Sequence, residues 1–472
     1  MSSLKFGTSG LRGLVTDLVG EAAIVWTQAF LHHLEREDPA TQKTLMVGRD
    51  LRSSSPQIAS NCVAAAQACG WTAIDCGELP TPALAMAVFD AGAAGVMVTG
   101  SHIPDDRNGL KFYRSDGEIT KSDEAGILAR FTASTPVAAR SSLPVEDRSH
   151  EALQAYKTRY TRFFDADALA GLTVGIYQQS TVARDLLVEI LSMLGAKVVV
   201  LGRSDQFVPV DTEAHRPEDV TLIREWAASN RFDAIISADG DADRPLVADQ
   251  HGQILRGDLL GLLTASSLGL TTLATPVTSS SAVERSGVAT SVYRTRVGSP
   301  YVIEAMVQAT ASGHESVLGF EANGGVLLGS SIVRNNKQLK ALPTRDAVLP
   351  IIAALIHART SPLHEVPAQL RAGIALANRL QNIPSATSRQ FVQRLESDAP
   401  YAENFFRPAG SIASLNALDG LKVTLQDGAT VHFRPSGNAP EFRCYVEAES
   451  AERAEDLLQW GLAASARELG QT

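Results

Sequence analysis

Three aspartates follow an apolar run at alternate positions, in the segment Ala-Asp-Gly-Asp-Ala-Asp-Arg. The carboxylates of Asp239, Asp241 and Asp243 repel one another unless a cation lies between them, and oxygen ligands alone suit Mg²⁺ or Ca²⁺. An EF-hand calcium loop needs Gly at its sixth position and Glu at its twelfth. Counted from Asp239, those positions hold Arg244 and Gln250, so the EF-hand interpretation fails. The segment therefore predicts a binding site for a hard divalent cation.

A second segment, Gly-Ser-His-Ile-Pro, presents Ser101 and His102 in a turn after the apolar run Val-Met-Val and a threonine. Turns at the carboxyl ends of strands are where open α/β sheets bind ligands. A serine beside a histidine suggests a hydrolase nucleophile, but the surroundings are not the Gly-x-Ser-x-Gly of a nucleophile elbow. Read by itself, the segment is more typical of a turn with an N-capping serine.

A third segment, 434–443, has an arginine at each end and a Ser-Gly-Asn turn between them. Backbone N–H groups in such a turn, together with hydroxyl, amide and guanidinium donors, form a cradle for phosphate. The donors would be Arg434, Ser436, Gly437, Asn438 and Arg443. The alternative is a hairpin loop with two surface arginines.

Two glycine-containing segments complete the set. In 319–325, Glu321 and Asn323 can hydrogen-bond sugar hydroxyls, although a plain glycine turn would have a similar composition. In 6–13, glycines allow the backbone to approach an anion closely, and Arg12 supplies positive charge.

The elements that must position these loops follow a repeated pattern. Segments 45–75 and 172–201 each read as strand, turn, helix, glycine and strand, and 275–293 reads as a weaker copy. This is the pattern of βαβ units in a mostly parallel sheet. Segment 421–433 reads instead as a hairpin, which one more strand and a closing helix follow. We expect three α/β domains and one α+β domain, at 1–140, 150–252, 253–365 and 370–472.

The composition limits the classes of function. The chain has 472 residues, 44% hydrophobic and 20% charged, with a formal net charge of −10. This excludes a disordered, collagen-like or coiled-coil protein, and the acidic balance argues against nucleic-acid or anionic-membrane partners. The four cysteines match neither a CxxC pair nor a zinc-site spacing, so we expect reduced thiols. Without an evident signal peptide or membrane-length apolar stretch, we expect a cytoplasmic protein.

In their order and spacing, the five segments resemble the α-D-phosphohexomutase superfamily, which includes the phosphomannomutase/phosphoglucomutase enzymes. The likeness extends from Phe6 to the final helix. It implies three related α/β mixed-sheet domains plus a C-terminal α+β domain around a central cleft, each domain with one active-site loop. It also implies an isomerase that interconverts hexose 1-phosphate and hexose 6-phosphate, with mannose as the first expected sugar and glucose as the second. The partners would be small-molecule sugar phosphates, bound by a monomer or homodimer.

The resemblance further implies a role for each loop. Ser101 would carry a phosphoryl group, with a hexose 1,6-bisphosphate as intermediate and activator. One Mg²⁺ would be held by Ser101, Asp239, Asp241 and Asp243. The catalytic groups would be Ser101, Arg12, His102 and Lys111, the last as candidate general base or acid. The substrate would be bound by Arg244, Arg296, Glu321, Asn323, Arg434, Ser436, Gly437, Asn438 and Arg443.

Two departures from the family pattern affect the interpretation. Ala242 stands where glycine is common, which a turn with negative φ at that residue tolerates. The sugar loop reads Phe-Glu-Ala-Asn, not Glu-x-Ser, so a phosphoglucosamine mutase or a glucose-only phosphoglucomutase is an alternative. Outside the mutases, the alternatives are a non-catalytic sugar-phosphate sensor and a metal-dependent phosphatase with Ser101 as nucleophile.

Overall fold

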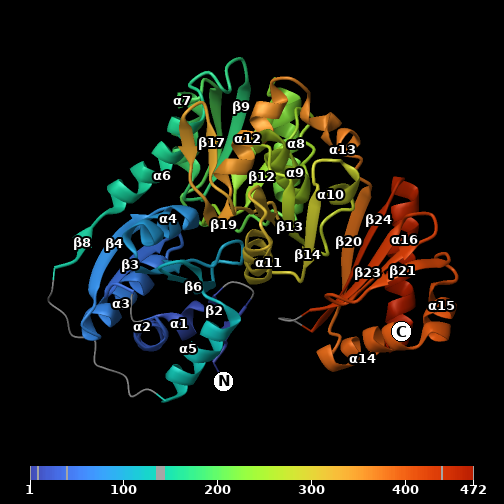
Figure 1. The fold of residues 1–472 in the computed structure, drawn as a ribbon, viewed down its shortest axis with the longest axis horizontal. Helices are drawn as coiled ribbons and strands as arrows, with labels where there is room; N and C mark the ends of the chain where they lie inside the picture. The colour runs from blue at the N-terminus through green and yellow to red at the C-terminus, as the bar shows by residue number, and fades with distance from the viewer. Residues whose placement is uncertain (1, 8–9, 39–40, 134–143, 437–439, 471–472) are drawn as a thin grey trace.

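The computed structural model describes residues 2–7, 10–38, 41–133, 144–436 and 440–470. Within these ranges the strands form four large sheets, which follow one another along the chain, and a separate two-stranded ribbon. Figure 1 shows the first sheet in blue on one side of the molecule and the C-terminal sheet in red on the other, with the second and third sheets above and between them. No helix in the described ranges is both long and apolar enough to span a membrane.

The first sheet is mixed and has helices on both faces. Its order is β1-β2-β6-β5-β3-β4-β8, with β7 paired to β6. Alternate residues of β3 point to opposite faces, so Leu45 and Val47 join the core under one helix layer and Met46 the core under the other. The strands are β1 (Lys5–Phe6), β2 (Leu11–Leu14), β3 (Thr44–Arg49), β4 (Thr72–Glu78), β5 (Ala94–Val98), β6 (Arg107–Arg114), β7 (Gly117–Glu118) and β8 (Glu146–Asp147). The helices are α1 (Val15–Leu18), α2 (Glu21–Glu37), α3 (Ser55–Ala68) and α5 (Lys121–Ala133) on one face, and α4 (Thr81–Ala91) and α6 (Ser149–Phe163) on the other.

The second sheet has the predicted strand-helix-strand order. Its central strand β9 lies parallel to β10 and β11, and β12 returns antiparallel to β11. Gly70 and Gly195, predicted to end helices in the first two units, have φ of 75° and 93°, a conformation that favours glycine. The elements are β9 (Thr173–Gln179), α7 (Arg184–Met193), β10 (Lys197–Arg203), α8 (Pro217–Ser229), β11 (Ala234–Ala238) and β12 (Pro245–Ala248).

The third sheet repeats the arrangement, with β13 parallel to β14 and β15 and with β16 antiparallel to β15. Its elements, with the ribbon β17–β18, are α9 (Gly257–Leu268), β13 (Thr272–Pro276), α10 (Ala282–Arg285), β14 (Ser291–Thr295), α11 (Ser299–Ala311), β15 (Val317–Phe320), β16 (Val326–Leu328), β17 (Ile332–Arg334), β18 (Lys337–Leu339), β19 (Leu342–Asp346) and α12 (Val348–Ala358).

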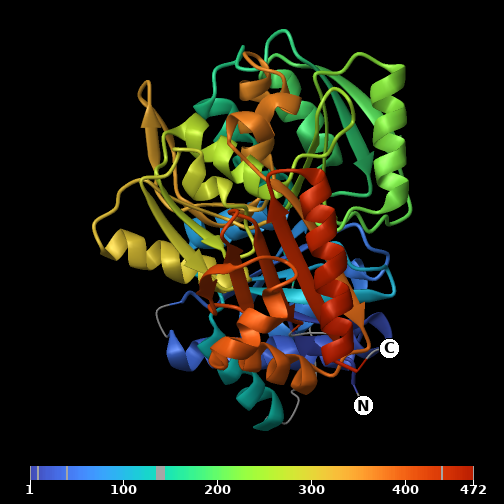
Figure 2. The same cartoon turned by 90° about the vertical axis from the view of Figure 1, so that its right-hand side faces the viewer.

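The C-terminal sheet is antiparallel, in the order β20-β24-β23-β22-β21. Its helices pack on one face, around Phe391, Phe406 and Leu457, and Figure 2 shows α16 running along that face. The elements are β20 (Ile374–Gln381), α14 (Ser385–Ser397), α15 (Ala399–Phe406), β21 (Ile412–Asn416), β22 (Leu421–Leu425), β23 (Thr430–Pro435), β24 (Glu441–Ala448) and α16 (Ala451–Glu468). The short η1 (Leu363–Glu365) and α13 (Val366–Gln369) precede them in the chain and pack against the core of the first three units.

The first three units share a hydrophobic core, and the C-terminal unit has a separate one. One core continues through the first three units and includes Leu84, Ile190 and Ile351, whereas the C-terminal unit has its own core around Phe433. The predicted fold class is confirmed: three related mixed-sheet α/β units precede an α+β unit. The expected domain boundaries stay a prediction, and β8 pairs with the first sheet although it lies beyond residue 140.

Candidate active site

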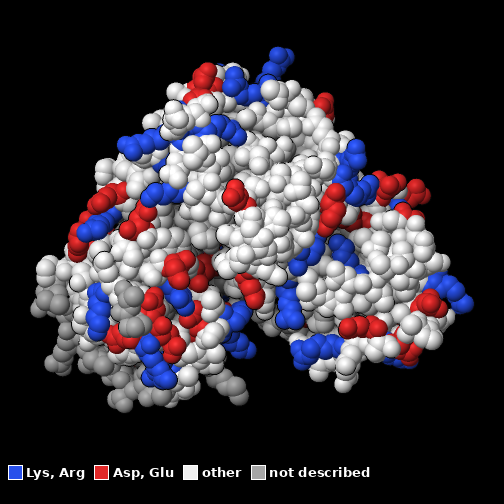
Figure 3. Space-filling view, viewed as in Figure 1, with Lys and Arg blue, Asp and Glu red and all other residues white. Residues whose placement is uncertain are grey.

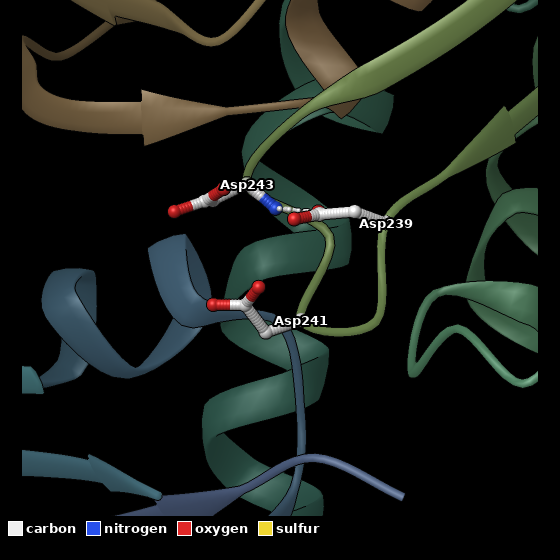
Figure 4. A group of neighbouring side chains, drawn as sticks. All are labelled: Asp239, Asp241 and Asp243. Carbon is white, nitrogen blue, oxygen red and sulfur yellow. Dashed lines mark hydrogen bonds between the residues drawn. The ribbon is translucent and has the colours of Figure 1, made fainter. Parts of the chain in front are cut away.

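The three aspartates lie on the turn between β11 and β12. Asp239, Asp241 and Asp243 are fully buried, and each offers a carboxylate oxygen within 4.8 Å of the others. Figure 4 shows the three side chains on the same turn, with the backbone N–H of Asp243 donating to Asp239 Oδ1 at 3.2 Å. Asp241 Oδ1 and Asp243 Oδ1 are buried without a hydrogen-bond partner among the described residues. Buried carboxylate oxygens that lack a donor fit a hard divalent cation.

The prediction for the backbone conformation of this turn is wrong at one residue. Ala242 has φ +54°, in the left-handed region, and not the negative φ that the sequence suggested. The turn has to reverse the chain between two antiparallel strands while keeping three carboxylates on one side. A left-handed residue makes that reversal, at a cost of about 1–2 kcal/mol for a residue with a Cβ.

Replacing Ala242 with glycine is expected to raise the free energy of unfolding by up to about 1 kcal/mol. Glycine removes the steric cost of the left-handed backbone, and this gain exceeds the extra backbone entropy that glycine loses on folding. Urea denaturation measures it. The matched control is Ala238→Gly in β11, which should lower stability by roughly 0.5–1 kcal/mol. A similar loss in both variants would contradict the strain argument.

Two buried cations contact the aspartates. Lys111 of β6 donates from Nζ to Asp241 Oδ2 at 2.6 Å and to Asp243 Oδ2 at 2.5 Å. Arg345 of β19 donates to Asp243 Oδ2 at 2.8 Å and to Glu321 Oε2 at 2.9 Å. The first and third sheets thus each supply a buried cation to a loop of the second.

The aspartates respond to this field in opposite directions. Burial, with the charges of Asp241 and Asp243, raises the pKa of Asp239 well above its ordinary value. Burial also pushes the pKa of Asp243 upward, but the cations Arg345 and Lys111 outweigh it and hold that pKa well below its usual range. An added divalent ion would stabilise the ionised form of Asp239 by the same electrostatics.

Ser101 points into this cluster from the turn after β5. Its hydroxyl donates to Asp239 Oδ2 at 2.5 Å, and its Oγ lies 3.2 Å from His102 Nδ1. The residue is buried and has φ +55°, an uncommon backbone for serine. Strained residues of this kind cluster at functional sites. The loops of the first and second sheets therefore meet with a hydroxyl against a carboxylate.

His102 and Arg244 adjoin the serine. Arg244 Nη1 lies 3.1 Å from His102 Nδ1. Burial, with the charges of Arg244 and Arg12, lowers the pKa of His102 to about 2. The imidazole is therefore neutral at physiological pH, and its Nδ1 accepts a hydrogen bond from the guanidinium.

Arg12 of β2 is a third guanidinium in this group. Its Nε and Nη2 atoms are buried and have no hydrogen-bond partner in the described part of the chain. Burial and the charge of Arg244 lower its pKa to about 10. Donors left unused in this way suit an anion with several oxygens.

A cavity of about 1020 Å³ opens beside the cluster, between the loops of the second and third sheets and the C-terminal sheet. Figure 3 shows basic side chains beside the hollow between the C-terminal unit and the rest of the molecule. The basic and histidine side chains that line the cavity come from all four units, and include His102, Arg244, Arg256, Lys422, His432 and Arg443. Five Lys or Arg side chains face three carboxylates in this lining, those of Asp211, Glu213 and Glu447. The cavity of this acidic protein therefore has a positive balance, which suits an anionic ligand.

The segment predicted to cradle phosphate connects β23 with β24 and is only partly described. Arg443 lines the cavity, while Arg434 donates from Nε to Asp419 Oδ2 at 2.9 Å. Ser436 is buried, and its backbone N–H donates to Glu441 O at 2.9 Å. Two further predicted donors lie outside the described residues: Gly437 and Asn438.

The segment predicted to read sugar hydroxyls makes internal contacts. Glu321 is the ion-pair partner of Arg345, and Asn323 Oδ1 accepts from Gly325 N at 3.0 Å. Both side chains are buried, and between them Ala322 lines the cavity. Arg296 is exposed, donates from Nε to Leu418 O at 3.3 Å and does not line the cavity. The structure therefore joins Glu321 to the aspartate cluster and leaves Arg296 apart from it.

Sequence reasoning missed Arg345 and the cavity face of the C-terminal sheet. Arg345 stands next to Asp346 in an otherwise apolar stretch before α12, and such a buried charged pair is a usable signal. Lys422, His432 and Tyr445 carried no such signal, because alternating residues of a half-exposed strand have the same composition wherever that face points.

His432 on this face has a testable effect on stability. Burial lowers its pKa to about 4, so below pH 6.5 the unfolded chain takes up a proton that the folded protein resists. Acidification from pH 7 to 5 should therefore lower the free energy of unfolding of the wild type by about 2 kcal/mol more than that of His432→Gln. Urea unfolding at both pH values measures this, with His150→Gln at an exposed histidine as control. Equal pH dependence in wild type and His432→Gln would contradict it.

Comparison with known proteins places these features in a family. Four models described as phosphoglucomutase/phosphomannomutase match in order: alpha/beta/alpha domain I at residues 3–137, domain II at 153–252, domain III at 256–372 and the C-terminal domain at 393–459. A phosphomannomutase of Sinorhizobium fredii is 49% identical over 97% of this chain and 98% of its own. One of Salmonella muenchen is 42% identical over 100% and 97%. A phosphoglucomutase/phosphomannomutase family protein of Burkholderia thailandensis has the same fold, with a TM-score of 0.77, 20% identity and coverage of 98% and 97%.

Proposed function

Since this chain belongs to the phosphoglucomutase/phosphomannomutase family, we propose that it is a phosphohexomutase that interconverts hexose 1-phosphate and hexose 6-phosphate, with mannose as its preferred sugar. Two relatives at 42–49% identity are named phosphomannomutase, whereas the relatives named phosphoglucosamine mutase or probable phosphoglucosamine mutase share 27–32%. Glucose phosphates are the expected second substrates.

One observation carries the proposal: the Ser101 hydroxyl donates to Asp239 at 2.5 Å, inside a cluster of carboxylates and cations that adjoins a basic cavity. In the proposed reaction, the Oγ–P bond of phospho-Ser101 breaks as a bond forms between phosphorus and a free hydroxyl of the hexose monophosphate. The product is a hexose 1,6-bisphosphate. The bisphosphate then reorients in the cavity. Its other phosphoryl group is transferred to Ser101 by the reverse of the first step.

The cations around Ser101 would stabilise the transferring phosphoryl group. Phosphoryl transfer depends mainly on positioning and on charge stabilisation, and Arg12 has unused buried donors for that purpose. Lys111 is our candidate general acid or base, since its Nζ lies within the cluster, where it donates to Asp241 and Asp243. As an ammonium it would deliver a proton to Ser101 Oγ as the Oγ–P bond breaks, and the amine so formed would take the proton of the attacking hydroxyl. The neutral His102 would orient the serine loop through its contact with Arg244.

The donor set supports one Mg²⁺, held by Asp239, Asp241, Asp243 and the phosphate on Ser101. When bound, the ion would supply positive charge next to the transferring group. The oxygens Asp241 Oδ1 and Asp243 Oδ1, which lack a hydrogen-bond donor among the described residues, support this assignment.

The non-reacting phosphate would lie against the loop from Arg434 to Arg443, with Ser436, Gly437 and Asn438 as donors. Arg443 and Arg244 both line the cavity, one from the C-terminal unit and one from the second unit, which supports two phosphate-binding groups in it. Glu321 and Asn323 would contact the sugar hydroxyls, and we assign Arg296 to substrate only after closure of the C-terminal unit, since it lies outside the cavity. The separate core of that unit is compatible with such a movement.

Coupled assays on mannose 1-phosphate, glucose 1-phosphate and glucosamine 6-phosphate, with Mg²⁺ and a trace of hexose 1,6-bisphosphate, test the proposal. We expect the largest kcat/KM for mannose 1-phosphate. Activity on the other two sugars alone would refute the sugar assignment. Net release of phosphate would indicate a phosphatase, and binding without turnover a sensor.

The remaining properties are proposed on the same basis. We expect a cytoplasmic protein with no nucleic-acid or membrane partner, and the free, mostly buried cysteines of the described chain are compatible with a reducing compartment. We expect a monomer or a homodimer, which light scattering would distinguish. The proposed domains extend over 1–140, 150–252, 253–365 and 370–472.

A further inference from the structure

Arg52 lies directly beneath the Ser101 loop with its side chain completely buried. Its guanidinium has five N–H donors, and each has an acceptor. Nε donates to Asp50 Oδ2 at 3.1 Å. The other four donors reach backbone carbonyls of the loop: Ser101 at 3.0 Å, Ile103 at 2.6 Å, Pro104 at 2.8 Å and Arg107 at 3.1 Å.

The carboxylate partner of Arg52 supports the same loop from its other end. Asp50 Oδ2 accepts a hydrogen bond from Thr99 Oγ1 at 2.7 Å. Thr99 Oγ1 in turn accepts one from the backbone N–H of Ser101 at 2.8 Å. Both the N–H and the C=O of Ser101 are thus fixed by one buried ion pair, which accounts for the left-handed backbone of this serine.

The second unit covers the other face of the guanidinium. The ring centroid of Phe207, in the connection after β10, lies 3.8 Å from Arg52 Cζ. Gly240 of the aspartate turn packs against the same ring, since a Cβ there would come within 2.9 Å of Phe207 and 2.8 Å of Ser101 O. Arg52 therefore links the position of Ser101 to the position of the aspartate turn.

We propose that Arg52 is a positioning residue for phosphoryl transfer, which holds Ser101 in line with the aspartate cluster without touching the substrate. This inference rests on the proposed function, because it concerns the geometry of the phosphorylated serine. Lysine cannot replace Arg52: an ammonium has three donors at one point, whereas the acceptors lie along both edges of a planar fork.

The test is Arg52→Lys, compared with the wild type and with Arg453→Lys. Arg453 of the C-terminal unit also donates to a carbonyl, Ala409 O at 2.6 Å, and to a carboxylate, Asp427 Oδ2 at 2.7 Å, far along the chain from the site. We expect Arg52→Lys to lower kcat on the order of 100-fold with KM within threefold, because a displacement of about 1 Å costs that much in rate. Intact mass after incubation with hexose 1,6-bisphosphate should show a matching fall in the rate of Ser101 phosphorylation.

The control separates positioning from stability. We expect Arg453→Lys to lose thermal stability while its kcat stays within twofold of the wild type. A folded Arg52→Lys with wild-type kcat and phosphorylation rate would overturn the inference while leaving the proposed function intact. An inactive wild type would instead refute the proposed function.

If Arg52→Lys does not fold, the double variant Asp50→Asn/Arg52→Gln provides the test, because it removes both buried charges together and leaves neither unpaired. The same loss of kcat at unchanged KM is expected there, and wild-type kcat in the folded double variant would overturn the inference. Phe207→Leu keeps every hydrogen bond of Arg52 and should lower kcat less than fivefold; a larger loss than in Arg52→Lys would also overturn it.

Discussion

Replacing Ser101 with alanine is expected to lower mutase turnover at least about 10⁴-fold, even with added hexose 1,6-bisphosphate, because the variant has no oxygen to carry the phosphoryl group. The hydroxyl is small, and its removal leaves the aspartates and their partners Lys111 and Arg345 in place, so the fold should persist. Coupled assays measure the turnover, and intact mass should show no phosphorylation of the variant.

The matched control is Ser237→Ala in β11. Ser237 is also fully buried, and its hydroxyl donates to Tyr177 O at 2.7 Å, away from the cavity. This variant should lose about 1 kcal/mol of stability and keep its turnover. Undiminished activity in Ser101→Ala would refute the phosphoserine mechanism.

Asp243→Asn is expected to reduce both stability and turnover. Asp243 Oδ2 accepts hydrogen bonds from Lys111 at 2.5 Å and from Arg345 at 2.8 Å, so its neutralisation takes from each buried cation one of its two carboxylate partners. Lys111 keeps Asp241 and Arg345 keeps Glu321, so the expected cost is that of weakening buried charge-assisted hydrogen bonds, about 3 kcal/mol of unfolding free energy. Because the folded pKa of Asp243 is depressed, its contribution is complete above about pH 4 and is lost only as the pH falls further.

Removal of this electrostatic group should also lower turnover by on the order of 10²–10³-fold, with a higher Mg²⁺ concentration for half-maximal activity. The control Asp219→Asn removes a buried carboxylate that pairs with Arg216 at 2.8 Å and does not line the cavity. It should reduce stability and leave the Mg²⁺ requirement unchanged. An unaltered Mg²⁺ titration in Asp243→Asn would contradict the metal assignment.

The sequence predicted those parts of the site in which chemistry and local structure coincide. The aspartate turn and the serine turn each follow an apolar strand, and both lie where a parallel sheet presents its carboxyl ends. Their residue types are informative because carboxylates at alternate positions, or a serine after a buried strand, are unusual without a partner. The hairpin β22–β23 was predictable for a similar reason, since Asp-Gly between alternating residues is a local signal.

The sequence did not predict the contacts between units. Arg345 is more than 100 residues from Asp243 in the chain, and nothing local to either residue indicates that they form an ion pair. The left-handed φ of Ala242 was equally hidden, because alanine ordinarily avoids it and only the closed turn imposes it. Four of the five donors of Arg52 reach carbonyls 49 to 55 positions away, so its role was absent from the Arg-Asp-Leu-Arg segment.

The chain of 472 residues therefore encodes its family, its sheets and the types of its reactive groups in local patterns, because helix, strand and turn preferences act over a few residues. Packing of the first three units into one core decides which of those groups touch: it brings Ser101 to Asp239, and Lys111 and Arg345 to Asp243. The net charge of −10 illustrates the difference. It describes the whole chain, whereas the charge of the cavity depends on which side chains the fold turns toward it.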